Sequence, residues 1–365
     1  MSIQHTNYKI ALIGYQLANG GLGRAMANTS MVLSTSNAID VYVVVLEDSV
    51  AYQFAGNLVN FGAQNTSFFK RKIKKYTQLR TFLKNNKFDF VIDFRYRLNP
   101  ISEFVFTQWI YKNQQVIYRV ASSNLQTYFL KSTWQTRFLY KKAYAFVGVS
   151  QFVTKNVKEK YGFKNVITIN NALNFDEIDT LKNEEIPFHF NYILAVGNFR
   201  KIKQFDKLIL AYLNSNLPKQ NVKLLLLGKG EEEQNLKKLV QINNAEENIK
   251  FVPYSNNPYP YMKKAHFLVL CSAYEGFPNV LIESLACETP VVSFHLESGV
   301  NEIIHNQKNG ILVENQNFNA LTTTLNKLNY SSKLNENTRK SVEKFTFTTI
   351  LKKWLLVFNK ANNET

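Results

Sequence analysis

The chain repeats one pattern in both of its halves: a short run of apolar residues, then a stretch with helical periodicity, then another apolar run. Short runs rich in Val, Ile and Leu predict strands covered on both faces, and helical stretches between them predict βαβ units with a parallel sheet. The first half has candidate strands at 8–13, 41–46, 88–94, 116–121, 145–150 and 166–170. The second half has them at 192–196, 222–227, 249–252, 267–271, 290–293 and 310–313.

The pattern predicts an α/β protein with two doubly wound, Rossmann-like domains, the usual number for 365 residues at roughly 100–200 residues per domain. The polar stretch 174–191 is interpreted as the linker, so the domains are expected at 1–172 and 190–344. A final amphipathic helix is expected at about 345–360 and should return to the first domain. Ligands bind outside the carboxyl ends of parallel strands, so two facing sheets predict a central cleft.

The sequence favours a cytoplasmic protein that uses no metal. No apolar run approaches the ~18–20 residues that span a bilayer, and the N-terminus is typical of a first strand rather than of a signal peptide. Cys271 and Cys287 form no disulfide or metal-binding pattern, and the five histidines are scattered. We therefore expect no catalytic metal and no cofactor.

The net charge of +17 lies mostly in the first half. The segment 68–87 carries eight basic residues and no acidic one, with apolar residues near helical spacing. Such a basic amphipathic helix is typical of contact with an anionic membrane. The aromatic residues Trp134, Phe138 and Tyr140 lie beside further basic residues and extend this candidate surface. The alternative is an ordinary helix whose apolar face joins the core. No nucleic-acid-binding motif is present, so nucleic acid is not an expected partner.

The segment SAYEGFPNVLIESLACETPVVSF, residues 272–294, carries the strongest chemical signal. A buried strand ends there, a loop carries Glu275, and a helix with Glu283 follows. The free N–H groups at the start of that helix predict a phosphate site, and Glu275 is placed to accept hydrogen bonds from sugar hydroxyls. Glu283 lies five residues beyond Pro278, roughly 7–8 Å along the axis, which is a plausible distance from a diphosphate to a ribose. The alternative is a solvated Glu283 on an ordinary helix.

Glu275 and Glu283 form an E-x7-E motif, and the surrounding segment resembles the signature of glycosyltransferase family 4, whose members have the GT-B fold and retain anomeric configuration. The resemblance covers nearly the whole chain and is strongest at 192–313. It implies that Glu275 contacts the donor sugar and Glu283 the ribose of the nucleotide. It also implies that the backbone of the intervening loop lies against sugar and phosphate; that loop is Gly276, Phe277, Pro278 and Asn279.

Two further segments of the second half resemble the same family. In ILAVGNFRKIKQFDKLI, residues 193–209, Lys203 occupies the position of a lysine that neutralises the diphosphate. The family usually has Arg where this chain has Asn198 and Gly where it has Gln204, and Arg200 is a candidate for the missing charge. The family also shapes its nucleoside pocket with turns that match Gly228 and Tyr254, and Tyr254 is a candidate to stack on the base.

The first half has a glycine-rich loop, residues 19–24, which resembles the family's loop facing the donor and acceptor; Gly20 and Gly21 are its candidate contacts. The histidines that the family often has on the acceptor side are absent. Asp93 and Arg95 occupy one such position and are candidate acceptor residues, with a buried ion pair as the alternative. No side-chain base is assigned, because in retaining transfer the leaving phosphate is proposed to take the acceptor proton.

The resemblance implies a retaining glycosyltransferase that moves a hexose or N-acetylhexosamine from a nucleoside diphosphate sugar, with UDP as the expected nucleotide. The expected acceptor is a glycan or a lipid-linked glycan in cell-surface polysaccharide or lipopolysaccharide synthesis. The alternatives are an inactive GT-B partner subunit, suggested by Asn198 and the absent histidines, and a nucleotide-sugar epimerase. A polyanion-binding protein is the remote alternative; it predicts steep salt dependence and no preference among nucleotide sugars.

Overall fold

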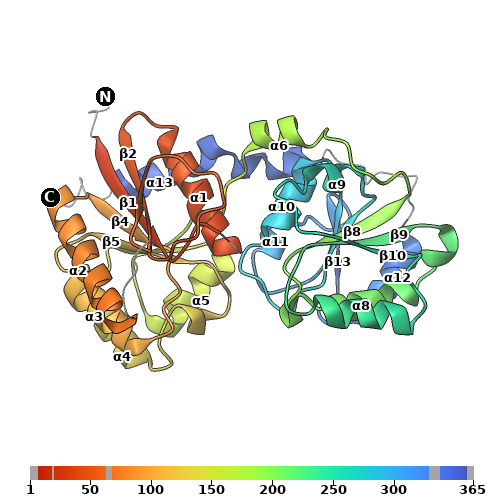
Figure 1. Ribbon diagram of the computed structural model, residues 1–365, viewed down its shortest axis with the longest axis horizontal. Helices are drawn as coiled ribbons and strands as arrows, with labels where there is room; N and C mark the ends of the chain where they lie inside the picture. Colours follow the sequence, from red (N-terminus) through yellow and green to blue (C-terminus); the bar gives the residue numbers. More distant parts are fainter. Residues whose placement is uncertain (1–6, 19, 63–67, 329–337, 360–365) are drawn as a thin grey trace. The chain divides into compact units, whose positions relative to one another are not determined.

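The computed structural model describes residues 7–18, 20–62, 68–328 and 338–359. The chain divides into two compact units, one formed by Met1–Ala172 with Phe347–Thr365 and the other by Leu173–Thr346. Each unit is built on one sheet, seven-stranded in the first and six-stranded in the second, and every strand pair in both sheets is parallel. Figure 1 shows the two sheets with their helices.

The seven strands of the first unit have the order β3-β2-β1-β4-β5-β6-β7, and six of them were expected from the sequence. These strands are β1 (Tyr8–Gly14), β2 (Ile39–Val45), β3 (Asn57–Asn60), β4 (Phe90–Asp93), β5 (Val116–Val120), β6 (Ala145–Gly148) and β7 (Val166–Thr168). The sequence did not predict β3, because this edge strand is partly exposed and its four residues, NLVN, form no apolar run.

The helices of the first unit cover both faces of its sheet. Side chains of α1 and the C-terminal α13 join one apolar core with β1, β2 and β4. On the other face α2 contacts β2 through the rings of Phe82 and Tyr42, 6.1 Å apart. The helices are α1 (Gly21–Ser34), α2 (Phe68–Asn86), α3 (Pro100–Val105), the π-helix η1 (Phe106–Ile110), the 3-10 turn η2 (Leu125–Thr127), α4 (Thr133–Leu139), α5 (Gln151–Tyr161) and α13 (Phe347–Asn359).

The α2 helix covers most of the basic segment 68–87. The side chains of its first five residues, 68–72, are outside the described part of the structure. In its described part Leu79 and Leu83 are fully buried, and the ring of Tyr76 lies 5.1 Å from that of Phe106 in a T-shaped contact. The described apolar face of α2 therefore joins the core, as the alternative interpretation held, and among the side chains of α2 from residue 73 onward only Ile73 is a large apolar one that is exposed.

The second unit has the strand order β10-β9-β8-β11-β12-β13. Its strands are β8 (Tyr192–Val196), β9 (Lys223–Leu227), β10 (Ile249–Val252), β11 (Leu268–Leu270), β12 (Val291–Phe294) and β13 (Gly310–Val313). All six were expected from the sequence. Its helices and 3-10 turns are α6 (Phe175–Leu181), η3 (Lys201–Lys203), α7 (Phe205–Leu213), η4 (Pro218–Gln220), α8 (Glu233–Ile242), α9 (Tyr259–Lys264), α10 (Asn279–Ala286), α11 (Val300–Ile303), α12 (Phe318–Lys327) and η5 (Lys340–Phe345).

The polar stretch 174–191 is not simply a linker. It contains α6, which packs against α9 and α10 of the second unit and contributes the buried Ile178. Arg339 donates to the carboxylate of Asp179 and to the carbonyl of Ala286, so α6 is also tied to the end of α10. Of the acidic residues that suggested a linker, Asp176 and Asp179 belong to this short helix, which the side chain of Asn174 caps at its start.

Candidate functional site

The second sheet reverses its order between β8 and β11, so the loops that follow these two strands diverge at their carboxyl ends. In open parallel sheets this switch point is where ligands bind. The connection after β8 contains the turn η3, whose last residue is Lys203. The loop after β11 carries Glu275. The two predicted residues therefore lie at the location that the topology itself marks as a binding site.

Lys203 and Glu275 form an ion pair. The Lys203 ammonium donates to Glu275 Oε1 at 2.6 Å, and the Ser272 hydroxyl donates to the same oxygen at 2.7 Å. A backbone hydrogen bond of 2.8 Å from Ala273 N to Ile202 O holds the two loops together. The side chains of Lys203 and Glu275 are 22% and 15% exposed, so the pair is held in place but remains reachable from solvent.

Ser272 is a member of this group that the sequence did not single out. Its side chain is fully buried, and its hydroxyl fixes one carboxylate oxygen of Glu275 from inside the protein. The other oxygen of Glu275 makes no contact with these two donors. Ser272 opens the SAYEGFPN segment, but a serine three residues before a glutamate carries no signal of its own.

The glycines of the neighbouring loops permit close backbone contact. A Cβ atom on Gly228 would lie 1.9 Å from the carbonyl oxygen of Gly197, so no side chain fits there. The backbone N–H of Phe199 donates to Lys229 O at 2.9 Å, which joins the loop after β8 to the loop after β9. Gly228 thus allows the loop after β9 to pack directly against the loop after β8. Asn198 lies in the loop after β8, between Gly197 and Phe199.

Arg200 and Tyr254 lie at the rim of this region. The nearest carboxylate to the Arg200 guanidinium is Glu231 at 3.9 Å, and both side chains are about two-thirds exposed. Such an exposed pair contributes little to stability, so Arg200 is readily available to an anionic ligand. The ring of Tyr254, 38% exposed, has the Lys229 ammonium 4.4 Å from its centroid, which adds a second cation to the rim.

The loop Gly276–Asn279 is fixed by its aromatic residue. Phe277 is buried, and its ring contacts that of Phe345 at 5.2 Å; the carbonyl of Gly276 accepts from Gly299 N at 2.9 Å. Pro278 is the residue that precedes α10 rather than its first residue, so the helix starts with the N–H groups of Asn279 onward. A rigid loop that leads into a helix N-terminus suits a phosphate or a sugar oxygen.

Glu283 is only 4% exposed, so it is not the solvated side chain of the alternative interpretation. It lies in α10 one turn before Cys287. Burial raises the pKa of the Cys287 thiol to about 12, and the negative charge of Glu283 adds to that effect. A buried carboxylate requires compensating partners, which is consistent with a residue positioned for a specific contact rather than for hydration.

Gln204 marks one departure from the family pattern, at a position whose backbone favours glycine. Its backbone has φ 52° and ψ 38°, the left-handed region, at the junction between η3 and α7. Glycine adopts this conformation without a steric penalty, which accounts for the glycine that the family usually has there. The side chain of Gln204 is 8% exposed and contacts Gln316, so here a buried amide accompanies the strained backbone.

The glycine-rich loop of the first unit lies beside a cavity of about 220 Å³. Gly20 has φ 121°, which favours glycine, and its N–H donates to the hydroxyl of Tyr52 at 3.1 Å. Gly21 begins α1, and a Cβ atom there would meet nothing within 4 Å, so this edge is open. The cavity lies at the carboxyl ends of β1 and β4; its lining includes Gly14, Tyr15, Gln16, Glu47 and Tyr96.

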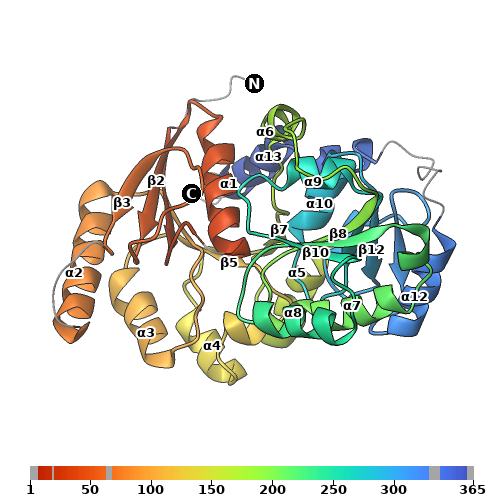
Figure 2. The same ribbon diagram turned by 45° about the vertical axis from the view of Figure 1, so that its right-hand side comes forward.

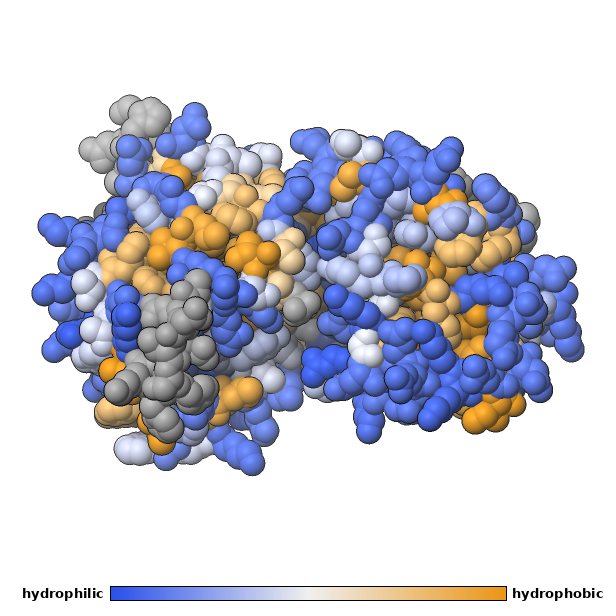
Figure 3. All heavy atoms as spheres, viewed as in Figure 1, coloured by the Kyte–Doolittle hydropathy of each residue, from blue (hydrophilic) through white to orange (hydrophobic). Residues whose placement is uncertain are grey.

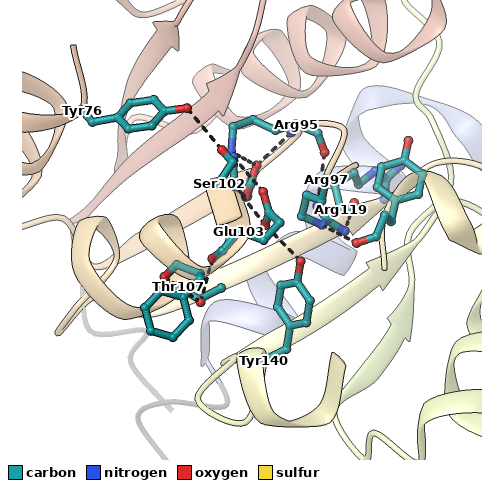
Figure 4. Close-up of polar contacts among 11 residues, drawn as sticks. Tyr76, Arg95, Arg97, Ser102, Glu103, Thr107, Arg119 and Tyr140 are labelled. Atoms are coloured by element: carbon teal, nitrogen blue, oxygen red, sulfur yellow. Dashed lines mark hydrogen bonds and ion pairs between the residues drawn. The ribbon is translucent and has the colours of Figure 1, made fainter. Parts of the chain in front are cut away.

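The candidate acceptor residues Asp93 and Arg95 are instead a buried ion pair, the alternative that the sequence left open. Both are fully buried, with 2.8 Å between Arg95 and Asp93, and Arg95 also pairs with Glu103 at 3.1 Å. Figure 4 shows Tyr140 reaching Glu103 from the end of α4. Burial raises the pKa of Glu103, and the Arg95 guanidinium opposes that rise. This network joins β4 to α3 and α4 and presents no group to solvent.

No group of three or more His, Cys, Asp or Glu side chains within the described ranges is arranged to hold a metal ion. Lys203, Arg200 and Lys229 supply positive charge at this site.

The chain is similar to known glycosyltransferases in sequence and in fold. Residues 176–345 match the family model of group 1 glycosyl transferases. Over 329 residues the chain is 28% identical to N-acetylgalactosamine-N,N'-diacetylbacillosaminyl-diphospho-undecaprenol 4-alpha-N-acetylgalactosaminyltransferase of Campylobacter jejuni, covering 86% of this chain and 88% of that protein. It is 26% identical to the amylovoran biosynthesis glycosyltransferase AmsD of Erwinia amylovora, covering 96% of this chain and all of that one.

Among solved structures, a Staphylococcus aureus TarM variant in complex with Fondaparinux, alpha-GlcNAc-glycerol and UDP superposes with a TM-score of 0.76 at 16% identity, covering 96% of this chain and 100% of that chain. This likeness establishes the fold, two parallel-sheet α/β domains of the GT-B type. Family model, relatives and fold together support one coarse identification: the chain is a glycosyltransferase with the GT-B fold.

Proposed function

We propose that this protein is a retaining glycosyltransferase that transfers a hexose or N-acetylhexosamine from a UDP-sugar to a lipid-linked glycan in cell-surface polysaccharide synthesis. The observation that carries the proposal is the Lys203–Glu275 pair at the switch point of the second sheet. The pair brings together a cation suited to a diphosphate and a carboxylate suited to sugar hydroxyls, which supports the proposal.

In this proposal the donor lies across the carboxyl ends of β8 and β11. Glu275, held by Ser272, accepts hydrogen bonds from hydroxyls of the donor sugar. Lys203 and Arg200 neutralise the diphosphate together with the N-terminus of α10, whose dipole favours negative charge. Glu283 holds the ribose, and Tyr254 with Gly228 and Asn198 borders the nucleoside.

The reaction breaks the bond between the sugar C1 and the diphosphate oxygen and forms a bond from C1 to the acceptor oxygen on the same face. The acceptor proton passes to the departing phosphate oxygen, so no side-chain base is required. Stabilising the leaving group is then the main task of the protein, and preorganised cations perform it well in a site sheltered from water. The proposal assigns this task to Lys203 and Arg200 and to no resident metal.

The printed names of related proteins support the choice of substrates. The Campylobacter jejuni relative is named for an undecaprenol-diphosphate acceptor, and the AmsD relative for amylovoran biosynthesis. The TarM structure holds UDP. By analogy we propose UDP as the nucleotide and a lipid-linked glycan at the cytoplasmic face of the membrane as the acceptor. Within the described part of the chain no helix is both long and apolar enough to cross a bilayer.

The test is a thermal-shift panel with UDP, GDP and their common sugar conjugates. A ligand at ~100 times its dissociation constant adds about 2.7 kcal/mol, which is a shift of several degrees for domains of this size. We expect stabilisation by UDP and by one UDP-sugar, and its loss in Glu283→Ala. A well-folded protein that responds to no nucleotide would contradict the proposal and favour the inactive partner subunit.

A further inference from the structure

The connections that follow β4 and β5 expose five large apolar side chains, although exposed residues of this kind are usually scattered singly. The exposed fractions are 67% for Leu98, 78% for Ile101, 54% for Phe104, 73% for Trp134 and 44% for Phe138. We call these residues, with the intervening surface of α3 and α4, the α3–α4 surface.

Four of the five side chains lie on two helices of the first unit that a hydrogen bond joins, and Leu98 shortly precedes the first of these helices. Ile101 and Phe104 lie three residues apart on α3 and so share one of its faces. Trp134 and Phe138 lie four residues apart on α4, with their rings stacked 6.0 Å apart. The hydroxyl of Tyr140, at the end of α4, donates to Glu103 of α3 at 3.0 Å and ties the two helices together.

The figures agree with this arrangement. In Figures 1 and 2 α3 and α4 lie side by side at the lower end of the first unit, with α2 next to α3. Figure 3 shows apolar atoms along that lower edge. The contact between α2 and α3 is made by the Tyr76 and Ser102 hydroxyls, 3.2 Å apart (Figure 4).

The exposed charge along the chain segment that carries the α3–α4 surface is basic. Between residues 94 and 158 the only acidic residue is Glu103, and it is buried against Arg95. Lys131, Lys141 and Lys142 of the same segment are exposed, and the Lys141 ammonium lies 5.0 Å from the centroid of the Phe138 ring. Exposed aromatic and aliphatic side chains in a segment rich in exposed lysines complement an apolar layer beneath anionic head groups.

We propose that the α3–α4 surface docks on an anionic lipid bilayer, with Ile101, Phe104 and Trp134 entering the interface and the three lysines contacting the head groups. The docking rests on the proposed function, since a lipid-linked acceptor is presented at such a surface. Tyr96, two residues before Leu98, lines the 220 Å³ cavity next to the glycine-rich loop. Docking by this surface therefore brings that cavity close to the bilayer.

The proposal differs from the expectation drawn from the basic segment 68–87 alone. There the described apolar residues Leu79 and Leu83 are fully buried in the core. The structure thus assigns the apolar contact to α3 and α4.

The test measures sedimentation of the full-length protein with vesicles of phosphatidylcholine containing 30% phosphatidylglycerol, and with phosphatidylcholine vesicles alone. Wild type should bind the anionic vesicles and bind the neutral ones far more weakly. Ile101→Ser/Phe104→Ser/Trp134→Ser should weaken binding by at least about tenfold, since each buried apolar side chain contributes to interfacial affinity. Lys131→Gln/Lys141→Gln/Lys142→Gln should weaken it on the order of 100-fold.

The matched controls are Ile242→Ser, on α8, and Leu356→Ser, on α13, which are 78% and 68% exposed in wild type. Both should bind vesicles as wild type does. The proposal would be overturned if the triple serine variant still bound vesicles, or if binding fell equally in the controls. It would also be overturned if the wild type did not bind vesicles. Stabilisation by UDP, measured on each variant, reports the donor site separately: its retention with lost vesicle binding shows that only the docking surface has failed.

Discussion

Glu275→Gln separates the two roles assigned to the ion pair at the switch point. In the protein without ligand the Lys203 ammonium is held by Glu275 at 2.6 Å, so a diphosphate must compete with this carboxylate for the same cation. Replacing the carboxylate with an amide removes the competition and keeps the size of the side chain. The variant should therefore bind UDP at least as tightly as wild type while its transfer activity falls.

The structure sets the magnitude of this effect. The side chains of Lys203 and Glu275 are 22% and 15% exposed, so the pair is neither fully exposed nor fully buried. Its interaction energy is therefore expected between the ~1 kcal/mol of an exposed ion pair and the several kcal/mol lost when a buried pair is broken. Relief of ~1 kcal/mol would tighten UDP binding by roughly fivefold. Lys203→Met instead removes a charged hydrogen bond worth about 1.5–3 kcal/mol and should weaken UDP binding by roughly 10- to 150-fold.

Isothermal titration with UDP measures both variants, and Lys201→Met is the matched control. Lys201 lies in the same 3-10 turn and is exposed, so its loss removes an equal charge without the contact to Glu275. UDP binding by the control should change less than about threefold, because a solvated charge is screened. Glu275→Gln that weakens UDP binding by more than tenfold, or Lys203→Met that leaves it unchanged, would refute the reasoning.

Three further predictions follow from the same structure. Arg95→Met leaves the buried carboxylates of Asp93 and Glu103 without their cation and should cost about 3–5 kcal/mol, a drop in Tm of at least ~6 °C by calorimetry; a smaller drop than ~2 °C would contradict it. Burial raises the pKa values of Cys271 and Cys287 to about 12, so neither thiol should react with a chromogenic disulfide at pH 8 until the protein unfolds; rapid native reaction would contradict their placement. Transfer should persist in excess EDTA, and its complete loss, restored by Mg²⁺, would contradict the assignment of Lys203 and Arg200.

The sequence predicted the strands well because their apolar runs are nearly continuous, as burial on both faces requires. The edge strand β3 was missed because residues 57–60 carry no such run. The segment 174–191 was misjudged as a linker because α6 is short and buries only Ile178. Its helical character depends on packing against α9 and α10, which a local pattern does not contain.

The site was predictable in part. The positions of Lys203 and Glu275 followed from motifs, but their direct contact did not, because it depends on how two loops 72 residues apart meet at the sheet edge. The hydrogen bond from Ser272 to Glu275 likewise depends on the folded arrangement of this loop. The left-handed backbone of Gln204 gives a physical reason for the glycine that the family usually has at this position, which the sequence alone did not supply.

The central claim is that the second unit binds a sugar nucleotide for transfer through Glu275. The most direct measurement is transfer of radiolabelled sugar from a panel of UDP-sugars to lipid-linked glycans extracted from membranes, with wild type and Glu275→Ala, and with the anomeric configuration of the product read by NMR. The account predicts transfer from one UDP-sugar with retained configuration, and loss of that transfer in Glu275→Ala while UDP still stabilises the variant. Turnover of Glu275→Ala near the wild-type rate, or a product of inverted configuration, would contradict it.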